Sequence, residues 1–160
     1  MTKAATKGSS VMPWLVSALL VLALGGALLV QWLSPTGGKA NPQDAAQVAA
    51  GQLLYGQYCI ACHQGQLQGQ PDWQKPLPSG RMPAPPHDES GHTWHHPDQV
   101  LFGIIRSGLV PPYAPVGYES DMPAFGGQLS DEQIWDLLAF LKSHWSPKIQ
   151  AWQEDKTRQY

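Results

Sequence analysis

Cysteine is scarce in this sequence, with two residues among 160. Two thiols are fewer than a structural zinc site usually takes, so a closed zinc centre is not favoured. Positive charge is also in short supply: beyond residue 33 there are 12 acidic residues against 8 Lys and Arg, a formal charge of −4. A mildly acidic surface of this kind excludes the generic basic footprint of a nucleic-acid-binding protein. The sequence also shows no internal repeat at the period of a solenoid.

Charge is absent altogether from Met12 to Leu33, a stretch rich in Leu, Val and Ala. Its length is about the 20 residues that a helix needs to cross a bilayer. Trp14 and Trp32 lie near its two ends, where aromatic rings favour the headgroup level. Lys3 and Lys7 precede it without any acidic residue, which places the N-terminus in the cytoplasm. The sequence therefore predicts a single-pass anchor in the bacterial cytoplasmic membrane, with the rest of the chain on the periplasmic side.

A cleaved signal peptide is the competing interpretation, with Gly38-Lys39-Ala40 as a weak cleavage site. The apolar core of a signal peptide runs for about 7–15 residues, shorter than this stretch, so an uncleaved anchor is favoured. The predicted organisation is a cytoplasmic N-terminus (1–11), a transmembrane anchor (12–33), a linker (34–43), a folded domain (44–146) and a polar C-terminal tail (147–160).

Both cysteines lie in the pentapeptide Cys59-Ile60-Ala61-Cys62-His63. Two cysteines at this spacing followed at once by histidine are the attachment pattern of c-type haem. Each thiol can form a thioether to a haem vinyl group, and the imidazole of His63 can bind the iron. A redox dithiol would need a strand before the motif, whereas the preceding residues have a helical pattern. The pentapeptide therefore predicts one covalently attached haem c per chain.

Three helices are predicted in the folded domain, which makes it all-α. They run from Asp44 into the pentapeptide, from Pro97 to the residue before Gly108, and from a capping box at Ser130 and Gln133 to a stop at Pro147. Two long stretches rich in Pro and Gly, about 64–96 and 109–127, separate them. Loops of this length are uncommon in a compact domain without a reason, and enclosing a flat cofactor is such a reason.

A second iron ligand is sought among the methionines, because haem iron often pairs His with Met in cytochromes c. Two of the four methionines lie at the membrane segment. Met82 follows His63 by 19 residues and Met122 follows it by 59. Only Met122 leaves room for the helix at Pro97–Ser107 on the way to the distal face of the haem. The sequence therefore predicts Met122 as the distal ligand.

These motifs, in this order, resemble the class I cytochromes c. The resemblance covers about 100 residues and rests on three segments: Gly51, Tyr55, Cys59, Cys62 and His63; Met122 to Phe125; and Ser130 to Lys142. It implies a cytochrome c-like three-helix haem domain with long loops, here preceded by one transmembrane helix. In that family the first and last helices cross at right angles. Gly51 would allow their close approach, against Leu137 and Phe140.

The resemblance also implies that His63 gives its second ring hydrogen to a proline carbonyl in the following loop, with Pro71 or Pro76 as candidates. The chain departs from the family in the insertion Trp73–His96, which looks like that of a subgroup of bacterial membrane-anchored monohaem cytochromes. Arg81 and Arg106 are candidate partners of the haem propionates, but each is more often a solvated surface charge.

The function that follows is one-electron transfer without substrate chemistry. The expected partners are a quinol-oxidising complex, a terminal oxidase or a similar redox enzyme, together with inner-membrane lipid. An alternative is a copper-handling or other metal-handling haem protein, since imidazoles bind both copper and zinc. Its candidate ligands are His87, His92, His95 and His96, with Asp88 and Glu89 beside them. The alternative for these histidines is that they cap the second helix, hydrogen-bond the haem propionates or are solvated. A haem enzyme acting on peroxide or nitrite is a third possibility, which requires an open axial position.

Overall fold

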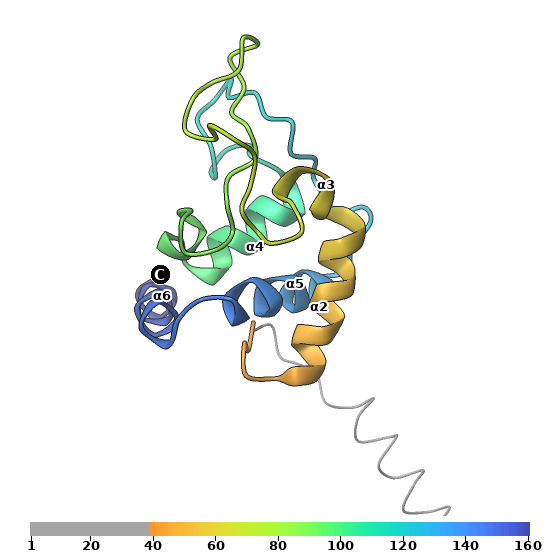
Figure 1. Ribbon diagram of the computed structural model, residues 1–160, viewed down its shortest axis with the longest axis vertical. Coiled ribbons are helices and arrows are strands. Elements are labelled where there is room, and N and C mark those ends of the chain that lie inside the picture. The colour runs from red at the N-terminus through yellow and green to blue at the C-terminus, as the bar shows by residue number, and fades with distance from the viewer. Residues whose placement is uncertain (1–38) are drawn as a thin grey trace, which may run out of the picture. The chain divides into compact units, whose positions relative to one another are not determined.

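Helix α2 (Ala45–Tyr58) opens the part of the chain that the computed structural model describes, residues 39–160 (Figure 1). Asp44 caps it as predicted, because its side chain accepts hydrogen bonds from the N–H groups of Ala46 and Gln47. The backbone leaves regular helical geometry at Cys59, and the short helix α3 (Ile60–His63) follows. The first predicted helix is therefore broken within the pentapeptide. The predicted span 12–33 lies outside the described residues.

Helices α4 (Asp98–Ser107) and α5 (Asp131–Ser143) match the second and third predicted helices. Pro97 stands one residue before α4 instead of opening it, and Gly108 ends α4 with a positive φ of 78°. The capping box at Ser130 is confirmed: its hydroxyl accepts from the N–H of Gln133 at 3.2 Å, and the Gln133 side chain accepts from the N–H of Ser130 at 2.9 Å.

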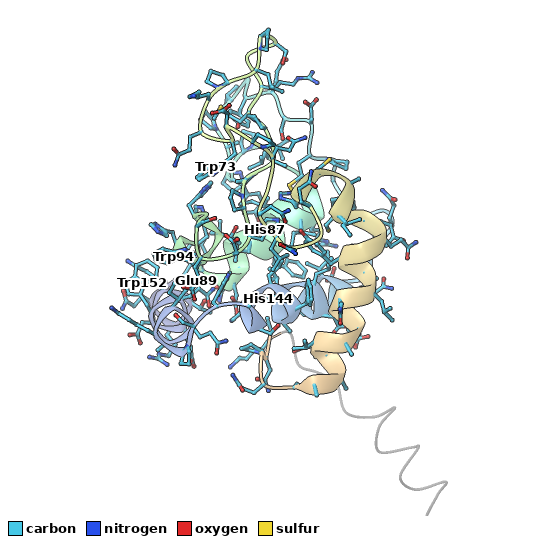
Figure 2. All side chains as sticks on the ribbon, viewed as in Figure 1. Trp73, His87, Glu89, Trp94, His144 and Trp152 are labelled. Atoms are coloured by element: carbon cyan, nitrogen blue, oxygen red, sulfur yellow. The ribbon has the colours of Figure 1, made fainter. Side chains whose placement is uncertain are left out.

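Two elements add to the three predicted helices. A 3₁₀ turn, η1 (Thr93–His95), precedes α4, and the segment expected to be a polar tail forms helix α6 (Pro147–Gln159). Helix α5 ends at Ser143, before the predicted stop at Pro147, and Pro147 opens α6, where a proline at the first turn is tolerated. Helix α6 packs against η1, with the Trp94 and Trp152 rings edge to face at 5.3 Å (Figure 2). Because the sequence of α6 is polar, nothing in it predicted this contact.

A buried polar network joins α4, α5 and α6. The Lys142 ammonium donates to both carboxylate oxygens of Asp98 at 3.0 and 2.7 Å, and both side chains are more than nine-tenths buried. Gln153, which is fully buried, donates to the same carboxylate at 2.7 Å. Buried charges are tolerated when they are paired and hydrogen-bonded in this way. The last helix is therefore built into the domain.

Helix α5 crosses α2, and the two pack closely (Figure 1). A Cβ atom added to Gly51 would lie 2.0 Å from the carbonyl oxygen of Asp136 and 2.8 Å from the Cβ of Phe140. The glycine is therefore required for the close approach, as the resemblance implies. Beside it, the rings of Tyr55 and Phe140 lie 5.2 Å apart. The buried core continues along α5 through Ile134, Leu137, Leu138 and Leu141.

Residues 39–160 contain helices and no strand, so the all-α prediction is confirmed for this part of the chain. In the same range, no helix combines the length and apolar character needed to cross a bilayer.

Candidate haem site

A cavity of about 630 Å³ lies among α2, α3, α4, α5 and the two long loops. This volume falls within the range of about 300–1,000 Å³ that is usual for cofactor pockets. Its walls are largely apolar, with side chains from α4 and α5 that include Leu101, Ile104, Ile105, Leu137, Leu138 and Leu141. The whole attachment motif faces it, because Cys59, Cys62 and His63 are all lining residues. An apolar chamber with two thiols and an imidazole on one wall fits a covalently attached haem.

The two cysteines are free thiols, half-buried at Cys59 and exposed at Cys62. Burial, with a smaller contribution from the neighbouring Cys62, raises the pKa of the Cys59 thiol to about 11. A redox dithiol works through a thiolate whose pKa is lowered, to between about 3.5 and 7.5. The environment of Cys59 acts in the opposite direction, and no strand precedes the motif within the described residues. The dithiol interpretation is therefore not supported.

His63 is buried and held through one ring nitrogen. Its Nδ1 lies 2.8 Å from the carbonyl oxygen of Pro85. Burial lowers the pKa of His63, which favours the neutral ring and outweighs the opposing effect of this hydrogen bond. With Nδ1–H as the donor, Nε2 keeps the lone pair that a metal needs. This geometry leaves Nε2 of His63 available to bind a haem iron.

The carbonyl acceptor differs from the prediction, which named Pro71 or Pro76. The loop after His63 folds back on itself, and Gln70 and Ala84 are joined there by two hydrogen bonds of 2.9 and 2.8 Å. This pairing brings Pro85 beside His63, although 22 residues separate them in the chain. The prolines nearest to His63 in sequence are therefore not the ones that accept its hydrogen bond.

His87 is a site residue whose contact with His63 the sequence did not predict. Its ring stacks on that of His63, with centroids 3.9 Å apart and planes inclined by 23° (Figure 2). Its Nδ1 lies 2.8 Å from the hydroxyl of Thr93, and its carbonyl oxygen accepts from the indole N–H of Trp145 at 2.9 Å. His87 therefore supports the proximal histidine and connects it to the end of α5. No sequence spacing indicated this contact.

Both candidate distal ligands, Met82 and Met122, line the cavity. Met82 is 37% exposed, whereas Met122 is partly buried and packs against the hydrophobic core. The segment after Met122 is fixed to α4, because the N–H of Phe125 donates to the carbonyl of Ile105 at 2.9 Å. Met122 thus has the better anchored backbone, and its assignment as distal ligand stays a prediction.

The two arginines considered as partners of the propionates are surface charges with other partners. Arg81 pairs with Glu119 and Asp121, and Arg106 pairs with Asp131 at 3.3 Å. Neither arginine lines the haem cavity. The loops that carry Arg81 and its two acidic partners face each other, which places the guanidinium in an exposed ion-pair network instead.

The histidines of the insertion do not come together as a metal site in the described part of the chain. Across residues 39–160, no three or more His, Cys, Asp or Glu side chains are arranged to hold a metal ion. The metal-handling alternative therefore has no ligand set in this part of the chain.

The chain matches one known protein family over most of its described residues. The sequence model described as "Cytochrome C oxidase, cbb3-type, subunit III" matches residues 46–141, more than half of the chain. The chain belongs to this family. Searches of curated proteins and of solved structures returned no match. As a cbb3-type cytochrome c domain, the chain carries a covalently bound c-type haem and is a haem-based electron carrier. The residues described above fit that cofactor.

Proposed function

We propose that the protein carries one electron at a time on a single haem c, as a membrane-tethered component of a respiratory chain. Cys59 and Cys62 would hold the haem through two thioether bonds, while His63 and Met122 would bind its iron from opposite faces. The haem supplies a metal that alternates between ferric and ferrous states. The observation that carries the proposal is His63, buried in the wall of an apolar cavity beside both thiols, with Nδ1 bound to a carbonyl.

The roles of the protein groups follow from their chemistry. The Pro85 carbonyl fixes the rotation of the His63 ring and raises the basicity of Nε2. The apolar walls exclude water, which controls the reduction potential of an iron centre. Histidine and methionine together would occupy both axial positions, which leaves no place on the iron for a substrate. The protein is therefore proposed as a carrier without catalytic chemistry of its own, acting alone or as an oxidase subunit.

Optical redox titration of the full chain tests this function. A single chromophore should be reduced and reoxidised in one one-electron step. The ferrous protein should bind no carbon monoxide at neutral pH, because both axial positions are occupied. Rapid formation of a carbon monoxide complex would indicate an open iron and favour the haem-enzyme alternative.

The proposed partners are a quinol-oxidising complex as donor and a terminal oxidase or similar enzyme as acceptor, reached from the periplasmic face of the membrane. The support is the family, whose description names an oxidase subunit, and the uncharged run from Met12 to Leu33. A tether of about ten residues would keep the haem domain within about 20 Å of its anchor at flexible-chain scaling.

Intact mass of the protein extracted from membranes tests the anchor. The mature chain should retain the span 12–33. A chain that begins near Ala40 or Asn41 and is recovered in the soluble fraction would mean a freely diffusing cytochrome.

A further inference from the structure

The charge on the walls of the haem cavity is unusual for a site that must accept an anion. Haem carries two propionates, yet the cavity is lined by no Lys or Arg, and its one carboxylate side chain is that of Asp121. The only side chains in the lining that can become positively charged are histidines. Leaving aside the iron ligand His63 and His87 stacked on it, two remain: His92 and His96.

His92 and His96 form a cluster with Trp73 at one end of the cavity. The Trp73 and His92 rings are stacked, with centroids 5.4 Å apart and planes inclined by 23°. The His92 and His96 rings meet edge to face at 5.8 Å. Each of these rings has an N–H to donate, and none of their ring nitrogens has a hydrogen-bond partner within residues 39–160. The cluster therefore presents unused donors to the cavity.

The position of this cluster matches the edge of the haem that carries the propionates. The vinyl groups and the propionates lie on opposite edges of the macrocycle, so attachment at Cys59 and Cys62 directs the propionates away from α3. Figure 2 shows Trp73 across the long loops from α3, on the same side of the picture as Trp94 of η1. Trp73 comes from the long loop, and His92 and His96 flank η1.

We propose that Trp73, His92 and His96 form the propionate-binding end of the site, and that imidazolium takes the place that arginine or lysine would otherwise fill. This rests on the proposed attachment of haem through Cys59 and Cys62. The histidine-rich insertion then has a function in the site: it supplies a counter-charge that depends on pH.

The proposal predicts a reduction potential that falls as pH rises. An imidazolium beside the haem stabilises the ferrous state, which has one positive charge fewer, more than the ferric state. By linkage, reduction raises the pKa of that histidine, so the potential is pH-dependent between the ferric-state and ferrous-state pKa values and flat outside them. The slope can reach about 59 mV per tenfold change in proton activity, the limit of one proton per electron.

Other ionisable groups lie near the cluster and affect its charge. Burial and neighbouring histidines lower the pKa of both His92 and His96. An adjacent propionate would raise it, because an anion favours the imidazolium form. His87 and His95 interact electrostatically with the cluster. Asp121 on the cavity wall pairs with Arg81, and Asp98, two residues after His96, pairs with Lys142. Asp98 and Lys142 neutralise each other, which leaves histidines as the groups that titrate near neutrality.

Spectroelectrochemical titration of the full chain between about pH 5 and pH 8 tests the proposal. The wild-type potential should decline with pH, and the His92→Gln/His96→Gln double variant should lose most of that slope. His144→Gln is the matched control, because His144 lies at the end of α5, packs on Phe140 and does not line the cavity, and it should keep the wild-type slope. A flat wild-type profile, a slope that persists in the double variant, or a slope lost in His144→Gln would overturn the proposal.

A second readout covers the case in which the double variant does not fold. Trp73→Phe removes one N–H and keeps an aromatic ring, and it should shift the propionate bands in the infrared redox-difference spectrum. Unchanged propionate bands would contradict the role of Trp73. Wild-type protein without covalent haem would instead refute the proposed function, so the two failures are distinguishable.

Discussion

Replacement of Met122 by leucine should abolish the weak red absorption band of the ferric protein that reports an iron–sulfur bond to methionine. It should also lower the reduction potential, on the order of 100 mV, within the range of about 0.8 V over which axial ligands set haem potentials. The physical reason is that a thioether favours ferrous over ferric iron, and leucine offers no lone pair in its place. The measurement is an optical spectrum of the ferric protein, followed by a potentiometric titration.

Met82→Leu is the matched control, because Met82 lines the same cavity. Its band and potential should remain those of the wild type. The difference is expected because the segment after Met122 is hydrogen-bonded to α4, whereas Met82 is 37% exposed on the long loop. If loss of the band follows Met82→Leu instead, the assignment of the distal ligand by chain length is wrong.

Gly51→Ala should lower the free energy of unfolding by about 1–3 kcal/mol, the usual cost of overpacking. The added methyl group would lie 2.0 Å from a backbone carbonyl oxygen of α5, and a backbone atom cannot move aside as a flexible side chain can. The two helices must therefore separate, which loosens the packing of Tyr55 against Phe140. Chemical denaturation monitored by far-ultraviolet circular dichroism measures the change.

Gly56→Ala provides the control in the same helix. A Cβ atom at Gly56 would meet nothing within 4 Å, so the only effect left is the gain from replacing a helical glycine. That gain is about 0.5–1 kcal/mol, and it should stabilise the protein. Equal destabilisation by both substitutions would show that helix crossing at Gly51 is not what requires a glycine.

Features with a local cause could be predicted from the sequence. Asp44 and Ser130 cap their helices through hydrogen bonds that reach only two or three residues along the chain. Gly108 ends α4 because glycine readily adopts the positive φ found there. The attachment motif is equally local, since both thiols and the imidazole fall within one pentapeptide.

Features that depend on contacts between distant segments could not be predicted in the same way. The carbonyl bound by His63 belongs to Pro85 because a loop returns after 22 residues, and no local signal encodes that return. Helix α6 is polar overall, and it is held by the buried Gln153 and by Trp152 against η1. Arg81 was favoured as a surface charge, yet no local signal indicated that acidic side chains from a loop about 40 residues away pair with it.

The measurement that tests the central claim most directly is the covalent haem content of the purified full-length chain. Acid–acetone extraction followed by a pyridine haemochrome spectrum, together with intact mass, reports how many haems stay bound to each chain. One haem per chain should resist extraction, and no free thiol should remain, because Cys59 and Cys62 are the only cysteines and both would be consumed. Haem that extracts freely, or two titratable thiols in the mature protein, would contradict the account.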